Sequence, residues 1–245
     1  MSIVRLIGLF LLSSLPALAF GPHTAHYQLS IGGFPIAQET RTLHQLPSHY
    51  FYTANAKTAG PAALIKDYQI AASASFVATP SGLKSLNYQI MEKEDGQINE
   101  NYNIEVNSDG SRVRSNPTQS QPEVTVWQAK KGAGNVVDPL TLFLAISHDL
   151  ETGSTLSYQV ANGKSLAVQD YQVTLNQPVQ INGYVVNATK VSRLNHNQPM
   201  SAYFVGQYHY LPILIQQRKN NKDYRYELIK IRFDQQPEQL LKVTL

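Results

Sequence analysis

Histidine is the most versatile chemical group in this chain, because it can bind a metal or transfer a proton near neutral pH. The sequence holds seven histidines and no cysteine, which excludes thiolate nucleophiles, thiolate zinc sites and disulfides. No His-Glu-x-x-His motif occurs, and no two histidines stand at helix spacing with a third ligand. His23 and His26 lie near the N-terminus, but Pro22 lacks the amide proton that an N-terminal copper site requires. We therefore expect these two histidines to be solvent-exposed, and we predict no metal and no cofactor.

His148-Asp149 has the residue types of a catalytic dyad. Both residues fall in an expected helix, where adjacent side chains point about 100° apart, so we do not expect them to pair side by side. We expect His148, near the C-terminus of that helix, to have a structural role at the negative end of the helix dipole. The Gly-x-Ser-x-Gly motif of many nucleophilic serines is absent. Gly132-Ala133-Gly134 lacks the Gly-Lys-Ser/Thr ending of a phosphate loop, and no two carboxylates are marked out as a glycosidase pair. We therefore predict no catalytic residues and a protein that is not an enzyme.

Tyrosine is abundant, with 14 residues. An aromatic ring with a polar tip suits cross-strand packing and the lining of a binding groove alike. If their segments are strands, Tyr208 shares a face with Tyr210, and Tyr224 shares one with Tyr226. The candidates for lining a ligand groove are these tyrosines and two residues of an expected helix: Tyr208, Tyr210, Tyr224, Tyr226, Phe143 and Leu144.

The elements that must position these residues are mostly strands. Apolar and polar residues alternate, as in Tyr27, Leu29 and Ile31, which gives each strand one apolar and one solvated face. Turn sequences that tolerate positive φ separate the alternating segments, and hairpins in succession without crossover helices predict an antiparallel meander. The predicted turns are Pro80-Ser81-Gly82, Asp95-Gly96, Asp109-Gly110, Asn162-Gly163, Asn182-Gly183 and Asn220-Asn221.

One segment, residues 138–150, breaks this period and predicts a helix. Asp138 suits the N-cap, Pro139 the first helical position and Gly153 the stop. The helix is apolar on nearly all sides, so we expect it to be buried in the concavity of a curved sheet. Near the C-terminus, Tyr224 to Leu228 and Ile229 to Phe233 place their apolar residues on opposite faces, which predicts a bulge or a strand that passes between two cores.

Residues 1–19 have the features of a cleaved secretory signal. Arg5 precedes a short apolar run from Leu6 to Leu12, and Ala17 and Ala19 suit signal peptidase. The run is shorter than the roughly 20 residues that span a membrane, so we expect no membrane span after cleavage. Residues 20–245 are interpreted as a single β-rich domain, with its core at about 25–233, a long loop at 116–122 and a short tail at 234–245.

Several stretches resemble the bacterial exported family called domain of unknown function 3108. They are Tyr27 to Gly33, Pro35 to Ala37, Ala56 to Gly60, Pro80 to Leu83, Asp138 to Leu144 and Leu211 to Ile213. The resemblance runs from about Tyr27 to Phe233 and implies an antiparallel β-protein in the periplasm of a Gram-negative bacterium. It brings no catalytic residues. This chain departs from the family in favouring Gln and Asn where relatives carry charges.

The expected fold is mainly β: a curved antiparallel meander that forms a barrel or paired half-barrels around the helix near 138–150. The leading functional hypothesis is a non-enzymatic periplasmic carrier of a lipid or another apolar or amphiphilic ligand. The alternative is an assembly factor that binds an envelope protein through strand edges and the tail Leu240 to Leu245. The net charge of +3 argues against nucleic acid. Alternation also suits an outer-membrane barrel, but the expected helix argues against one.

Overall fold

The computed structural model describes residues 21–116, 123–194, 196–219, 221–234 and 239–240. The signal expected at 1–19 and most of the loop expected at 116–122 lie outside these residues. The N-terminal strands are β1 (His23–Ile31), β2 (Phe34–Gln45), β3 (Tyr50–Thr58), β4 (Tyr68–Thr79), β5 (Gly82–Glu94), β6 (Gln97–Val106), β7 (Arg112–Asn116) and β8 (Thr125–Gln128). After the short β9 (Val136–Val137) and the helix α1 (Thr141–Thr152), the C-terminal strands are β10 (Ser157–Ala161), β11 (Leu166–Ile181), β12 (Tyr184–Arg193), β13 (Met200–Phe204), β14 (Pro212–Lys219) and β15 (Lys222–Phe233).

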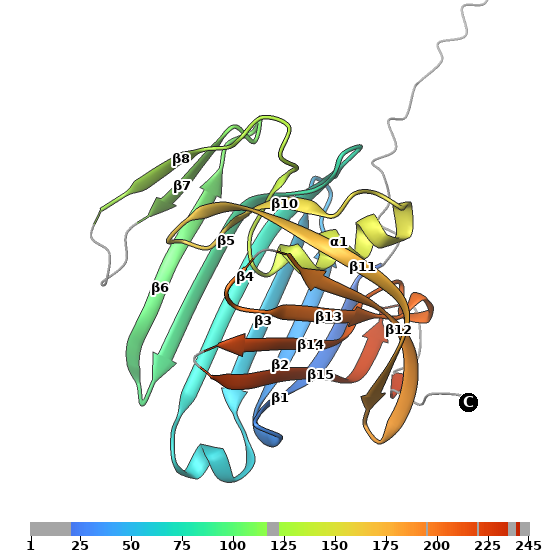
Figure 1. Cartoon of the computed structure of the whole chain (residues 1–245). Helices are drawn as coiled ribbons and strands as arrows, with labels where there is room; N and C mark the ends of the chain where they lie inside the picture. The colour runs from blue at the N-terminus through green and yellow to red at the C-terminus, as the bar shows by residue number, and fades with distance from the viewer. Residues whose placement is uncertain (1–20, 117–122, 195, 220, 235–238, 241–245) are drawn as a thin grey trace, which may run out of the picture.

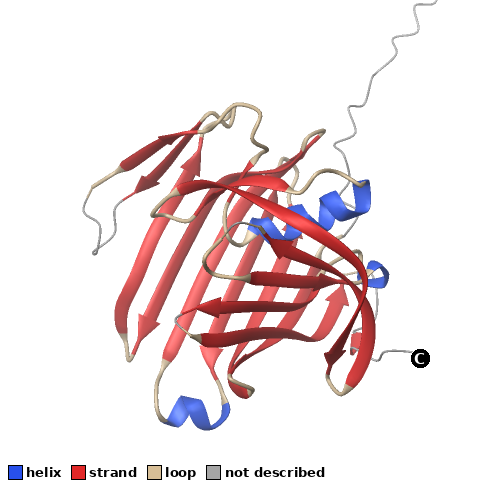
Figure 2. Ribbon diagram, in the orientation of Figure 1, coloured by secondary structure: helices blue, strands red, loops and turns tan. Residues whose placement is uncertain are grey.

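These strands form one sheet in the order β8-β7-β6-β5-β4-β3-β2-β1-β15-β14-β13-β12-β11-β10-β9. Neighbours are antiparallel, except that β9 pairs with β10 in parallel. The sheet turns over at the β1–β15 pair, so the C-terminal strands cross in front of the N-terminal strands (Figure 1). Its two end strands, β8 and β9, are not paired with each other. The mainly β, barrel-like class is thus confirmed, with an open sheet, and strands dominate the ribbon (Figure 2).

The expected buried helix is confirmed with a later start. Helix α1 begins at Thr141 because Asp138, Pro139 and Leu140 form its entry turn, so Pro139 precedes the helix. The carboxylate of Asp138 nevertheless accepts hydrogen bonds from the amides of Leu140 and Thr141, at 2.9 and 2.8 Å. The helix ends at Thr152 and is capped by Gly153, whose φ of 71° is left-handed, as expected of the stop. Its buried residues include Leu142, Leu144, Ala145 and Ile146, which confirms that it packs inside.

The predicted turns join strands in the expected places. Each sits between consecutive antiparallel strands, and Asp95-Gly96 and Asn182-Gly183 have positive φ at both residues. Asn221 also has positive φ, whereas Asn220 lies outside the described residues. The hairpin meander could therefore be derived from local turn chemistry.

The predicted register change in β15 is a β-bulge. Lys230 pairs with His26 and Leu228 pairs with Tyr27, so Ile229 is the extra residue. The bulge lets Leu228 and Ile231 both be buried, although they are an odd number of residues apart. Further along the chain, a two-residue strand, β16 (Gln239–Leu240), pairs with β15, while 241–245 of the tail lie outside the described residues.

The C-terminal strands contact the N-terminal strands again at the β10–β11 turn. The Ser115 hydroxyl on β7 donates a hydrogen bond to the carbonyl of Gly163, at 3.1 Å. Lys164 forms an ion pair with Glu100 on β6, at 3.0 Å. The ring of Tyr102 packs so closely on Gly163 that a Cβ there would lie 2.6 Å from it. We call these contacts the β10–β11 seam; they hold the two groups of strands over the buried interior.

Candidate functional site

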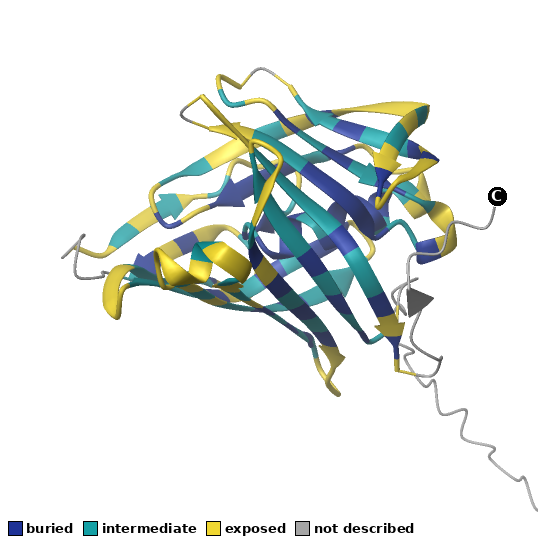
Figure 3. Ribbon diagram, turned by 90° about the horizontal axis from the view of Figure 1, so that it is seen from below, coloured by how far each residue is buried: buried dark blue, intermediate teal, exposed yellow. Residues whose placement is uncertain are grey.

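Strand β2 places two charged residues on the inner face of the sheet. Along β2, buried Ala37, Glu39, Arg41 and Leu43 alternate with more exposed residues, and similar alternation runs along the strands in Figure 3. Arg41 lies opposite two alanines, Ala25 on β1 and Ala54 on β3. These small side chains leave the space that the arginine side chain fills.

The guanidinium of Arg41 lies between aromatic rings and a carboxylate. Its Nη2 donates a hydrogen bond to Glu39 Oε2, at 3.0 Å. Its central carbon lies 4.8 Å from the ring centre of Tyr27 on β1 and 5.9 Å from that of Phe143 on helix α1. Arg41 is only 6% exposed. Burial is the largest single influence and lowers the pKa of Arg41. The charge of Glu39, the nearby Tyr52 and Tyr27 and the hydrogen bond to Glu39 together outweigh it, so the pKa of Arg41 is raised and its guanidinium stays protonated.

Two tyrosines complete the surroundings of this ion pair. Burial raises the pKa of Tyr52 to about 12, partly opposed by the positive charge of Arg41 and, more weakly, by a hydrogen-bonding interaction with the Arg41 side chain. Burial also raises the pKa of Tyr226 to about 12, and the charge of Glu39 adds to this effect while that of Arg41 opposes it. Both phenols therefore remain protonated at neutral pH. We refer to Tyr27, Glu39, Arg41, Tyr52, Phe143 and Tyr226 as the Arg41 cluster.

Two nitrogen atoms of Arg41 have no partner in the described part of the chain. Nε and Nη1 are buried, and neither donates a hydrogen bond to a described residue. Buried donors are nearly always paired, because leaving one unpaired forfeits its hydrogen bond to water. The arrangement therefore offers N–H donors inside an otherwise apolar and aromatic interior.

A half-buried face leads from the Arg41 cluster to one end of the sheet. Tyr68 on β4 donates a hydrogen bond to Glu92 on β5, at 2.7 Å. Burial is the main cause of a raised pKa of Tyr68. The hydrogen bond to Glu92, the charge of Glu92 and the nearby Tyr226 raise this pKa further. Tyr68, Glu92 and Tyr226 are all intermediate in exposure. Side chains of the N-terminal and C-terminal strands thus meet near the Arg41 cluster without being sealed from solvent.

The structure disperses the six predicted ligand-lining residues. Phe143 and Tyr226 lie in the Arg41 cluster, and Leu144 is buried within the core on α1. Tyr224 lies outside the Arg41 cluster and lines a hollow of about 610 Å³ beside Gln217 and Arg218. Their role in binding stays a prediction.

The interpretation of Tyr208 and Tyr210 as neighbours on one strand face is wrong. Tyr208 ends a short 3-10 turn, Gly206–Tyr208, and is buried. His209 and Tyr210 follow with left-handed φ values of 51° and 52°. The chain reverses here, which alternation alone does not reveal.

The expectation that His148 and Asp149 do not pair is also wrong. His148 Nδ1 lies 2.9 Å from Asp149 Oδ1. The Tyr158 hydroxyl donates to the other oxygen, Oδ2, at 2.8 Å. Burial and then the charge of Asp149 raise the pKa of this phenol. Both side chains sit near the end of α1, where they can bend toward each other despite their angular separation.

The two N-terminal histidines are in strand β1, not in an exposed segment. His23 is 1% exposed and its Nδ1 donates to the carbonyl of Gly21, at 3.0 Å. The Nδ1 of His26 lies 3.0 Å from the Thr40 hydroxyl on β2. The prediction of exposure failed because these residues belong to a strand paired on both sides, and because the His23 ring packs against those of Tyr52 and Phe233. No cluster of three or more His, Asp or Glu side chains suited to a metal occurs among the described residues.

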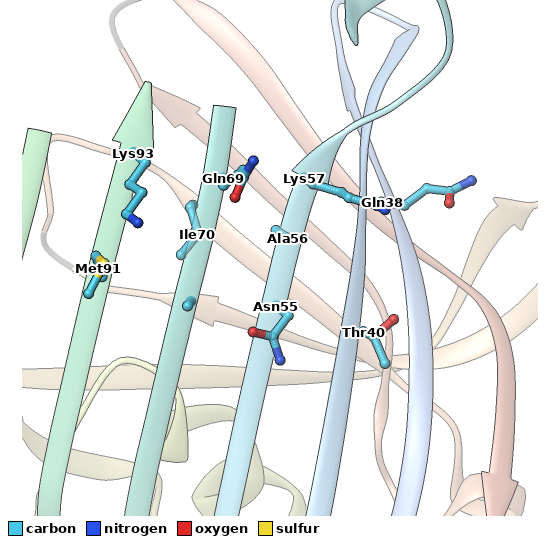
Figure 4. A pocket seen from close by; sticks show the side chains of 10 residues that line it. Gln38, Thr40, Asn55, Ala56, Lys57, Gln69, Ile70, Met91 and Lys93 are labelled. Carbon is cyan, nitrogen blue, oxygen red and sulfur yellow. The ribbon is translucent and has the colours of Figure 1, made fainter. Parts of the chain in front are cut away.

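The outer face of the same strands carries a separate, polar hollow of about 570 Å³. Figure 4 shows Gln38, Thr40, Asn55, Lys57 and Lys93 among its lining side chains. Gln38 and Thr40 alternate with Glu39 and Arg41 along β2, so this hollow and the Arg41 cluster lie on opposite faces.

The sequence pattern contains a signal for the Arg41 cluster that a search for apolar alternation alone overlooks. Glu39 and Arg41 are two residues apart, with opposite charges, and in phase with Ala37 and Leu43. Residues two apart in a strand share a face. Interpreting 34–45 as a strand would have placed an ion pair on its apolar face.

Comparison with known proteins shows the fold. No family model and no curated protein match the sequence. Among solved structures, the chain is similar to a crystal structure described as a β-barrel-like protein of domain of unknown function DUF1849 from Brucella abortus. The TM-score is 0.56 and the identity 9%, over 89% of this chain and 99% of that chain. The resemblance to domain of unknown function 3108 stays a prediction. None of the described helices is long and apolar enough to cross a membrane.

Proposed function

We propose that this protein is a non-enzymatic periplasmic binding or carrier protein for an apolar or amphiphilic ligand. The observation that carries the proposal is the half-buried face between the N-terminal and C-terminal strands, where Tyr68 and Tyr226 lead to the aromatic Arg41 cluster. β-Barrels can hold a small ligand in their interior or at their mouth, in pockets lined mostly by apolar and aromatic side chains. Tyrosine rings supply apolar contact, and their hydroxyls tolerate solvent at the entrance.

Binding of the uncharged dye N-phenyl-1-naphthylamine to the purified mature protein tests this proposal. We expect the dye to fluoresce on binding and the Tyr226→Ala variant to bind it several-fold more weakly, because the variant loses a ring at the entrance. Tyr184→Ala is the matched control, since Tyr184 is 46% exposed at the start of β12 and its loss should leave binding unchanged. Organic extraction followed by mass spectrometry should recover a co-purifying amphiphile. No dye binding together with empty extracts would contradict the proposal.

A further inference from the structure

The strongest unexplained feature of the interior is that Arg41 is buried with a partner for only part of its guanidinium. Nη2 donates to Glu39, whereas Nε and Nη1 donate to no described residue. These two atoms carry most of the N–H bonds of an arginine. The packed rings of Tyr27 and Phe143 hold the group in place, because the cation lies over both. The donors are thus fixed, buried and unsatisfied.

The charge of the cluster restricts which chemical group can bind there. Arg41 is positive and Glu39 is negative, so the pair is already neutral. A carboxylate or phosphate would bring an uncompensated negative charge into a buried setting, which is unfavourable. A neutral oxygen acceptor, such as an ester or amide carbonyl, satisfies the free donors without adding charge.

We propose that Nε and Nη1 of Arg41 bind the carbonyl oxygen of an uncharged acyl ester or amide, and that Glu39 excludes anionic amphiphiles of the same chain length. The acyl chain then lies along the apolar inner face, and the remainder of the ligand extends past Tyr226 toward Tyr68 and the open end. This inference rests on the proposed carrier function, because it specifies the class of ligand that the same interior accepts.

Displacement of N-phenyl-1-naphthylamine by two probes tests the inference. The probes are 1-monododecanoylglycerol, an uncharged ester, and dodecanoate, an anion with the same acyl chain. We expect the wild-type protein to bind the ester at least about tenfold more tightly, because dodecanoate would bring an uncompensated negative charge next to Glu39 in a buried setting. Equal affinities, or a preference for dodecanoate, would overturn the inference even where the dye binds well.

Two variants separate the donor from the charge. The double variant Glu39→Gln/Arg41→Met removes both charges together, which avoids an unpaired buried ion, and should lose about tenfold in affinity for the ester while it still binds the dye. Glu39→Gln alone leaves Arg41 positive and should shift the preference toward dodecanoate by at least about tenfold. The ratio of the two affinities does not depend on how much of the variant protein is folded, because both probes are measured on the same sample.

The outcomes distinguish this inference from the proposed function. If neither probe nor the dye binds, the carrier function fails. If the dye and the ester bind but both variants keep the wild-type preference for the ester over dodecanoate, the carrier function stands and the proposed role of Arg41 fails. Buried water would then be the partner of the Nε and Nη1 donors.

Discussion

His23 shows how burial changes the chemistry of a single residue. Its ring packs 5.8 Å from that of Phe233 and 6.3 Å from that of Tyr52, between centroids. Burial lowers the pKa of His23 to about 4, against smaller raising effects from the Gly21 carbonyl and Asp234, and His209 adds to the lowering. The folded protein therefore holds His23 neutral at a pH where an unfolded chain would protonate it.

This lowered pKa predicts acid sensitivity. The unfolded chain binds a proton near pH 6.5 and the folded chain only near pH 4, so the stability from neutral His23 is complete above pH 6.5 and is lost as the pH falls toward 4. Between pH 7.5 and pH 5, the free energy of unfolding of the wild-type protein should fall by about 2 kcal/mol more than that of His23→Gln. Urea denaturation at the two pH values measures this. The control is His44→Gln, at an exposed position of β2, whose free energy of unfolding should vary with pH as in the wild type. If the free energy of unfolding of His23→Gln also varied with pH as in the wild type, the lowered pKa of His23 would be contradicted.

At the scale of the element, Asp138 joins helix α1 to the sheet. Its Oδ2 accepts hydrogen bonds from the hydroxyls of Ser85 on β5, at 2.6 Å, and Thr141, at 2.7 Å. Its Oδ1 accepts two backbone amides of the entry turn. The amide of Asp138 also donates to the Ser85 hydroxyl, at 2.9 Å. One fully buried side chain thus fixes both where the helix begins and which strand it contacts.

We expect Asp138→Ala to lower the free energy of unfolding by about 2 to 4 kcal/mol, because it leaves several buried donors unpaired. Asp138→Asn should lose less, since its amide oxygen can still accept the backbone hydrogen bonds. Chemical denaturation followed by circular dichroism measures both, with Asp109→Ala in an exposed turn as the control. Equal losses for the Ala and Asn variants would show that packing, and not the acceptor oxygens, fixes the helix.

The elements of this chain could be predicted where local chemistry decides them. Asn182-Gly183 and Asp95-Gly96 permit positive φ and so specify hairpins without regard to the rest of the chain. The inward face of Arg41 and the burial of His23 depend instead on which strands lie beside β1 and β2. The partner of β1 is β15, about 200 residues away along the chain, and no local pattern specifies that pairing. Phe143 and Tyr226 bring α1 and β15 to the Arg41 cluster, and their aromatic side chains mark them as candidates. Glu39 and Arg41 both lie on β2, and a search for apolar alternation alone passes over such charged residues.

In the whole molecule, the β10–β11 seam brings the C-terminal strands against β6 and β7 of the open sheet. Gly163 and Gly183 each follow an asparagine and have similar left-handed φ values, 82° and 84°. Gly183 lies in a two-residue hairpin turn, and Gly163 lies in the four-residue connection 162–165. A Cβ at Gly163 would meet the ring of Tyr102 at 2.6 Å, whereas a Cβ at Gly183 would meet nothing within 4 Å. The two positions therefore impose a similar left-handed φ on a substituted residue, and they differ in whether a Cβ meets the opposite strands.

This pair of glycines isolates the seam from the turn. Gly163→Ala and Gly183→Ala should each lose about 1 kcal/mol from left-handed backbone strain, and Gly163→Ala should lose a further 1 to 3 kcal/mol or so from overpacking against Tyr102. Only Gly163→Ala should also speed amide hydrogen exchange in β6 and β7, because displacement of the turn disturbs the Ser115 and Lys164 contacts. Urea denaturation and hydrogen exchange measure the two effects. Equal stability losses with unchanged exchange would mean that the turn shifts freely and that contacts other than the seam hold the two groups of strands together.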